Sequence, residues 1–251
     1  TESERKKKEE AELQANEKAK EEAVIRTMKD VCKQRLLTES GPALDRIFVF
    51  NFSEYGLPRN KELPILRRME QEFLSDTETR KLVLEKMTEA MKDISEYTHV
   101  PLMPDKFPTL LTGKGFYNII NTDKTLLLDL YQTPAFKDFL ITYNRQVLKN
   151  SRRASPSSWK NFRNAWLELG VTDLENMFSD PDSIETIEAA IRHYSEEFVK
   201  SITQIKDLKT REEAKKHRRD NFLIPMIDDW KGLGYVPTHV MTELISSYEH
   251  L

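Results

Sequence analysis

The sequence predicts a mainly α protein, built as a multi-helix array. Apolar residues recur at spacings of three and four over long stretches, which is the period of a helix with one buried face. Helix starts also recur, because Thr133-Pro134, Ser155-Pro156 and Asp180-Pro181 each place a capping residue before a proline. Proline is favoured at the first helical position, where its missing N–H would be unpaired anyway.

The first stretch of the chain is expected to be a solvated, charged helix. Residues 1–23 contain only Leu13 and four alanines as apolar residues. Glu2 precedes Lys6 by four positions, an order that supports an isolated helix by about 0.2–0.5 kcal/mol for each such pair. This stretch has no repeat of a coiled coil, so we expect a helix that stands alone.

The end of the charged stretch marks the expected boundary between an N-terminal extension and a globular domain. An apolar stripe begins at Val24, and Gly41 and Pro42 are expected to end the helix that carries it. We therefore predict a charged N-terminal helical extension over 1–40 and a helical globular domain over 41–251. A subdivision of that domain near 105–115 is the alternative.

One segment, residues 46–52, has the composition of a minor β element. Its sequence is RIFVFNF, in which Phe48, Phe50 and Phe52 alternate. The segment could pair with the extended-looking run over 97–104 in a small two-stranded patch. The alternative is an apolar plug packed against helices.

Further helices are predicted from about residue 62 onward. Asp76 is expected to cap a helix start between two helices, and Thr210 with Glu213 has the spacing of a capping box. The helix that begins at Pro181 carries the longest apolar ridge. That ridge consists of Ile184, Ile187, Ile191, Tyr194, Phe198, Ile202 and Ile205.

The stretch SRRASPSSWKNFRNAWLELG, residues 151–170, allows two interpretations. Trp159, Phe162, Trp166 and Leu169 follow one another at spacings of three, four and three, which is typical of a core stripe. Tryptophans that stack on nucleic-acid bases must instead be exposed. We predict that these rings face the core.

Two basic segments are the candidate nucleic-acid-binding surface. Bases would not be read there, but Lys and Arg side chains can neutralise phosphates with a marked dependence on salt. The alternative is that both segments are ordinary solvated helix faces. The candidate residues are Arg152, Arg153, Lys160, Arg163, Arg211, Lys215, Lys216, Arg218 and Arg219. Ser155, which follows Arg152-Arg153-Ala154, is a candidate phosphorylation site.

Residues 134–178 resemble the helical core-binding domain of tyrosine recombinases. The similar parts are Phe136 with Phe139-Leu140, and then SPSSWKNFRNAWLELGVTDLENM. The resemblance implies contact with DNA through this segment. The catalytic His-x-x-Arg box of that family is missing, because His217 is followed at the third place by Asp220, and no tyrosine nucleophile can be assigned.

Composition limits the remaining function classes. The net charge is −3, so no bulk attraction to nucleic acid follows. Cys32 is the only cysteine, which excludes an internal disulfide or a cysteine zinc site and is typical of an intracellular protein, cytoplasmic or nuclear. The five histidines are scattered, so we expect no metal site and no cofactor. The longest apolar runs are too short for a transmembrane helix.

These observations favour a non-catalytic helical module for protein–protein interaction or assembly. No set of nucleophile, base and oxyanion donors can be named, although dispersed catalytic residues would escape notice in one sequence. Because the chain begins with Thr1, we expect a segment of a larger protein. Its partner is expected to be another protein or a second copy, with nucleic acid as the alternative and no membrane contact.

Overall fold

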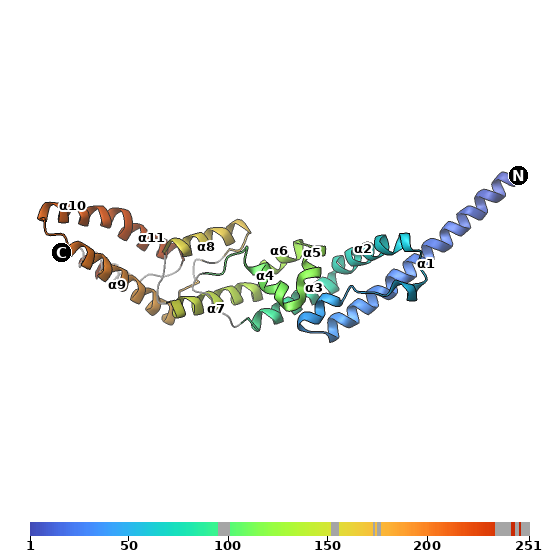
Figure 1. The fold of residues 1–251 in the computed structure, drawn as a ribbon, viewed down its shortest axis with the longest axis horizontal. Coiled ribbons are helices and arrows are strands. Elements are labelled where there is room, and N and C mark those ends of the chain that lie inside the picture. Colours follow the sequence, from blue (N-terminus) through green and yellow to red (C-terminus); the bar gives the residue numbers. More distant parts are fainter. Residues whose placement is uncertain are drawn as a thin grey trace. The chain divides into compact units, whose positions relative to one another are not determined.

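The computed structural model of this protein is mainly α-helical, as predicted (Figure 1). It describes residues 1–94, 101–151, 156–172, 174, 177–233, 242, 243 and 246, and none of these lies in a β-strand. The helices form two compact units. Unit 1 contains residues 1–94 and 108–130, and unit 2 contains the other described residues.

Unit 1 is built from a long first helix and shorter helices that follow it. Its elements are α1 (Glu2–Thr38), the 3-10 helices η1 (Gly41–Arg46) and η2 (Phe52–Tyr55), α2 (Arg59–Ser75), α3 (Thr77–Lys92), α4 (Phe107–Leu111), a wider helical turn η3 (Thr112–Phe116), α5 (Tyr117–Thr122) and α6 (Thr125–Tyr131). Helix α1 packs against α2, and η1 packs against η3 (Figure 1).

Helix α1 changes character along its length. Residues 1–20 are exposed on every side, as expected of a charged, solvated helix. Further on, Ile25, Met28, Cys32 and Leu36 are buried at spacings of three and four, which places them on one face. The second part of the predicted extension over 1–40 therefore contributes to the core of unit 1.

The minor β element predicted over 46–52 is wrong. The chain leaves η1 at Arg46, turns at Ile47 and Phe48, and enters η2 at Phe52. The guanidinium group of Arg35 binds the carbonyl oxygens of Ile47 (3.2 Å) and Val49 (2.5 Å), which a strand partner would otherwise need. Ile47 and Phe48 are buried, so the alternative of an apolar plug describes this segment.

Three of the predicted helix caps are confirmed. The carboxylate of Asp76 accepts a hydrogen bond from the backbone N–H of Thr79 (3.0 Å), and that of Asp180 accepts one from Ser183 (3.3 Å). The hydroxyl oxygen of Thr133 accepts one from the N–H of Phe136 (3.2 Å). Each bond satisfies a backbone donor in the first turn of its helix.

The capping box predicted at Thr210 and Glu213 is wrong. The cap of that helix is Asp207, whose carboxylate accepts from the backbone N–H (2.8 Å) and from the hydroxyl group (2.6 Å) of Thr210. Aspartate competes well for this position, so the helix begins earlier and Thr210 lies in its first turn.

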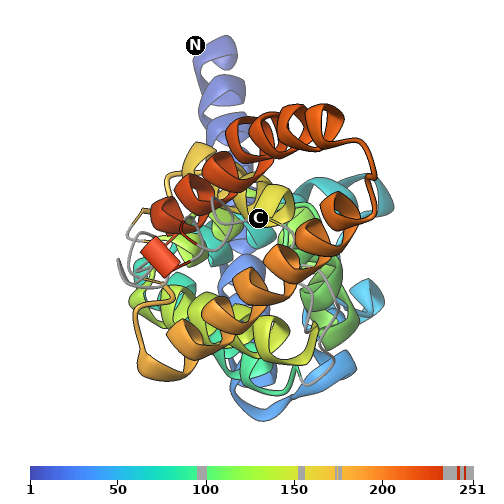
Figure 2. The same cartoon turned by 90° about the vertical axis from the view of Figure 1, so that its left-hand side faces the viewer.

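Unit 2 contains the longer helices of the second part of the chain. They are α7 (Pro134–Ser151), α8 (Pro156–Glu168), α9 (Pro181–Thr203), α10 (Leu208–Arg218), the wider turn η5 (Arg219–Leu223) and α11 (Ile224–Leu233). Helix α7 packs against α9, and α8 packs against α11. Figures 1 and 2 show that α10 turns back along α9 after a short connection.

The aromatic side chains of α8 lie in the core of unit 2. Trp159, Phe162 and Trp166 are buried, which confirms the predicted core stripe and leaves no face for base stacking. The ring of Trp159 meets that of Phe178 edge to face at a centroid distance of 5.0 Å. Trp166 donates a hydrogen bond from its Nε1–H to the carbonyl oxygen of Leu102 (2.7 Å). In the ridge of α9, Ile187 and Ile202 are buried.

In the described part of the chain, no helix combines the length and the apolar character that crossing a lipid bilayer requires.

Candidate functional site

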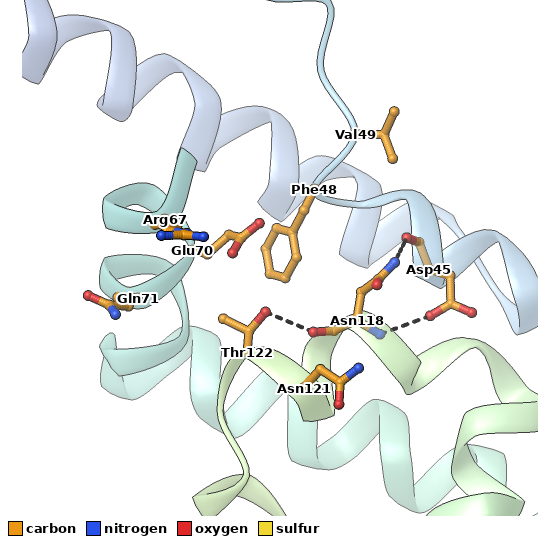
Figure 3. Close-up of a pocket in the computed structure, with 9 residues that line it drawn as sticks. All are labelled: Asp45, Phe48, Val49, Arg67, Glu70, Gln71, Asn118, Asn121 and Thr122. Carbon is orange, nitrogen blue, oxygen red and sulfur yellow. Dashed lines mark hydrogen bonds between the residues drawn. The ribbon is translucent and has the colours of Figure 1, made fainter. Parts of the chain in front are cut away.

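Unit 1 contains an open pocket of about 480 Å³ (Figure 3). Three elements form its walls: η1 with the turn after it, helix α2 and helix α5. The lining residues are Asp45, Phe48, Val49, Arg67, Glu70, Gln71, Asn118, Asn121 and Thr122. Figure 3 shows the ring of Phe48 between Glu70 and Asn118, with Thr122 below the ring.

One wall of the pocket is held in place by paired hydrogen bonds between η1 and α5. The backbone N–H of Asn118 donates to Oδ1 of Asp45 (3.2 Å), and the side-chain amide of Asn118 donates to the backbone carbonyl of Asp45 (2.7 Å). Thr122 donates its hydroxyl to the carbonyl oxygen of Asn118, one turn earlier (2.8 Å). These bonds hold the start of α5 against η1, which joins two of the three walls of the pocket.

The remaining polar side chains of the pocket are not used by the fold. Arg67, Glu70, Gln71 and Asn121 make no side-chain hydrogen bond to any residue that the structure describes. Glu70 is half-buried, and this burial raises the pKa of its carboxyl group, while the positive charge of Arg67 opposes the shift. The pocket thus presents one anionic acceptor, one cationic donor and two carboxamides to a ligand.

The groups that line the pocket can form hydrogen bonds and ion pairs with a ligand. The pocket lacks a serine, cysteine or histidine, and the described residues contain no group of three ligands that could hold a metal ion. Cys32 lies elsewhere in unit 1, where burial raises the pKa of its thiol to about 12. A thiol that stays protonated at neutral pH is a poor nucleophile.

The predicted basic residues of unit 2 are partly occupied by the fold. Lys160 forms an ion pair with Asp229 (3.5 Å). Arg211 donates two hydrogen bonds to the carbonyl oxygen of Ile205 (3.0 and 2.8 Å), in the connection between α9 and α10. Both side chains therefore stabilise unit 2 itself.

Of the other basic candidates, Lys215, Lys216 and Arg218 lie in the last turn of α10, and Arg219 begins η5. Arg218 donates a hydrogen bond to the hydroxyl group of Ser201 on α9. Lys216 is exposed, whereas Lys215 and Arg219 are half-buried. Arg163 is half-buried on α8. Arg152, Arg153 and the candidate phosphorylation site Ser155 lie outside the described residues.

Sequence reasoning missed the pocket. Asp45 and Asn118 are 73 positions apart, and no pattern in the chain relates them. Arg67, Glu70 and Gln71 are close neighbours on α2, but three polar residues on a helix are usual for a solvated face. The phenylalanine residues at 48–52 were the one sequence feature that pointed to this region, because apolar rings there must pack against another element.

No protein-family model matches the sequence, and no curated protein or solved structure matches it. Conclusions about function therefore rest on the geometry of the molecule.

Proposed function

We propose that this chain is a non-catalytic interaction module that binds a partner protein through the pocket of unit 1. The observation that carries the proposal is the set of unused hydrogen-bonding groups on Arg67, Glu70, Gln71 and Asn121. Guanidinium, carboxylate and carboxamide groups pair well with peptide groups and with charged side chains. The side chains of this pocket can therefore form hydrogen bonds and ion pairs with the polar groups of a bound protein chain.

Exposed apolar side chains on the same elements support a protein as the ligand. Val49 in the turn after η1 is 59% exposed, Leu63 on α2 is 53% exposed and Tyr117 on α5 is 54% exposed. Leu63 precedes Arg67 by four positions, and Arg67 precedes Gln71 by four, so these residues share one face of α2. Aromatic and aliphatic side chains close to polar groups are typical of protein-binding surfaces.

The test blocks the pocket and compares partner capture. Asn121→Trp places a bulky ring in the pocket, and Asn16→Trp, at another exposed helical asparagine, serves as the matched control. We expect the wild type and Asn16→Trp to retain the same protein from an extract of the source cells, and Asn121→Trp to lose it. Equal capture by both variants would exclude the pocket as the binding site.

Self-association is a special case of the same function. A mass measurement in solution at rising concentration distinguishes a second copy of the chain from a different partner. If the wild type stays monomeric and captures nothing, the interaction proposal fails.

Nucleic-acid binding through α10 is the second candidate, since Lys209 and Lys216 are exposed there and lie seven positions apart, on one face of the helix. Retention on a DNA or RNA column at low salt should then fall steeply as salt is raised. Lys209→Glu with Lys216→Glu should abolish it. We choose these two lysines because Arg211 and Arg218 bind other parts of unit 2. No retention at low salt excludes this candidate.

A further inference from the structure

We propose that the pocket of unit 1 receives a basic side chain, arginine or lysine, from the partner protein, with the carboxylate of Glu70 as its counterion and the ring of Phe48 as its apolar floor. This inference rests on the proposed function and names the chemistry that the partner must present.

Glu70 carries the electrostatic part of the inference. Its carboxylate is half-buried on α2, and no described residue donates a hydrogen bond to it. A partly desolvated anion without a donor is unfavourable, and its raised pKa reflects that cost. Arg67 affects Glu70 through its charge without forming an ion pair to it, so the site for a donor at the carboxylate is open. A guanidinium or ammonium group would supply that donor.

Phe48 supplies the apolar part. Its ring lies in the pocket beside Glu70 (Figure 3) and is held edge to face on Phe73, at 5.8 Å and an interplanar angle of 90°. Arginine and lysine carry long hydrocarbon stems that pack on apolar surface while the charged end reaches a polar partner. A carboxylate next to a fixed phenyl ring therefore fits a basic side chain better than a neutral one.

The charges and the size of the pocket agree with this ligand. Asp45 and Glu70 are acidic and Arg67 is basic, so the lining has an excess of one negative charge. A volume of about 480 Å³ accommodates one long side chain together with the peptide groups that flank it. Gln71 and Asn121 can bind those peptide groups, since each carboxamide offers both a donor and an acceptor.

The test uses three capped peptides of the sequence Gly-Ser-X-Ser-Gly, in which X is arginine, glutamine or glutamate. Binding to the full chain is followed by NMR titration of the protein at millimolar peptide. We expect the arginine peptide to shift the signals of α2 and α5 and to bind at least tenfold more tightly than the glutamine peptide. Capped arginine without flanking residues is included, to separate recognition of a side chain from recognition of a peptide.

Substitutions at Glu70 test whether its carboxylate causes the preference for the arginine peptide. Glu70→Gln removes the charge and keeps the shape, and it should weaken the arginine peptide at least tenfold. Glu12→Gln, at an exposed glutamate of α1, removes the same charge elsewhere and should leave binding unchanged. Glu70→Lys should turn the preference toward the glutamate peptide.

The outcomes separate this inference from the proposed function. The inference is overturned if no peptide binds, if the arginine and glutamine peptides bind equally, if the glutamate peptide binds best to the wild type, or if Glu70→Gln has no effect. In each case the proposed function still stands if Asn121→Trp abolishes partner capture. Selective binding of the arginine peptide with unchanged partner capture by Asn121→Trp would show that the pocket selects a basic side chain but that the partner binds elsewhere, which contradicts the proposed function and the assignment of that side chain to the partner.

Discussion

A Cβ atom added to Gly115 would lie 2.2 Å from the carbonyl oxygen of Gly41. Gly115 also has a φ of 93°, a conformation that residues with a side chain rarely adopt. The close approach brings η3 onto η1, which carries Asp45 and so forms one wall of the pocket. The clashing atoms belong to the backbone, so they cannot move aside as a flexible side chain would.

The first prediction is that Gly115→Ala is strongly destabilising. The left-handed conformation and the clash together should lower the free energy of unfolding by more than about 2 kcal/mol. Urea unfolding followed by far-UV circular dichroism measures the change. Gly113→Ala, two positions earlier, is the control, because no atom lies within 4 Å of its added Cβ. That variant should match the wild type or gain roughly 0.4–1 kcal/mol, and equal stability of the two variants would contradict the prediction.

Local patterns explain which parts of the fold could be predicted. The stripe from Trp159 to Trp166 and the cap at Asp180 depend on residues three or four positions apart, so the sequence displays them directly. The segment over 46–52 allows both a strand and an apolar plug from its sequence, because the choice depends on Arg35, whose guanidinium group binds the backbone carbonyls of this segment.

The candidate site could not be predicted for a related reason. Its walls come from η1, α2 and α5, and only the tertiary fold brings Asp45 next to Asn118. The basic candidates were visible as charge, but the sequence does not reveal that Arg211 and Arg218 would bind oxygen atoms of the same unit. The role of a polar side chain depends on its tertiary contacts, which the sequence does not show. The burial of an apolar stripe, in contrast, can be predicted from the spacing of its residues along the sequence.

The second prediction concerns Arg80, which joins α3 to α6 and to the turn before it. Its guanidinium group binds the carboxylates of Asp123 and Asp129, each at 2.6 Å, and its side chain is only 19% exposed. Arg80→Lys keeps the charge but loses the fork geometry, so the free energy of unfolding should fall by roughly 1–3 kcal/mol. Arg68→Lys is the control, because its pair with Glu72 is exposed and should be worth about 0.5 kcal/mol or less. Similar losses in urea unfolding would mean that the network adds nothing beyond a surface pair.

The third prediction is the pH dependence that Asp123 contributes. Burial alone would raise the pKa of this carboxyl, but hydrogen bonds from Thr125 and Arg80 outweigh it and hold the pKa below its ordinary value of 3.8. The folded state therefore binds the proton less tightly than the unfolded state. The resulting stability is fully present above the ordinary value, and it is lost as the pH falls through the lowered pKa of the folded protein.

Asp123→Asn removes this titration. The variant should be less stable than the wild type near neutral pH, and its stability should fall less steeply between about pH 5 and pH 3. Urea midpoints measured across that range give both slopes. Asp30→Asn, at an exposed aspartate of α1, should follow the wild-type curve. A slope for Asp123→Asn that equals the wild-type slope would exclude a contribution from Asp123.

The fourth prediction separates two buried tryptophans of α8. Trp166 donates its Nε1–H to the carbonyl oxygen of Leu102, which is itself buried, and Trp159 packs on Phe178 and Trp230. Phenylalanine at either position removes a similar volume, but at Trp166 it also leaves a buried acceptor without its donor. An unsatisfied buried carbonyl costs about 1–3 kcal/mol. Trp166→Phe should therefore lower the free energy of unfolding by that amount more than Trp159→Phe does, as measured by urea unfolding with far-UV circular dichroism. If the two variants are equally stable, water replaces the lost donor at Leu102, and the bond from Trp166 does not contribute to the stability of unit 2.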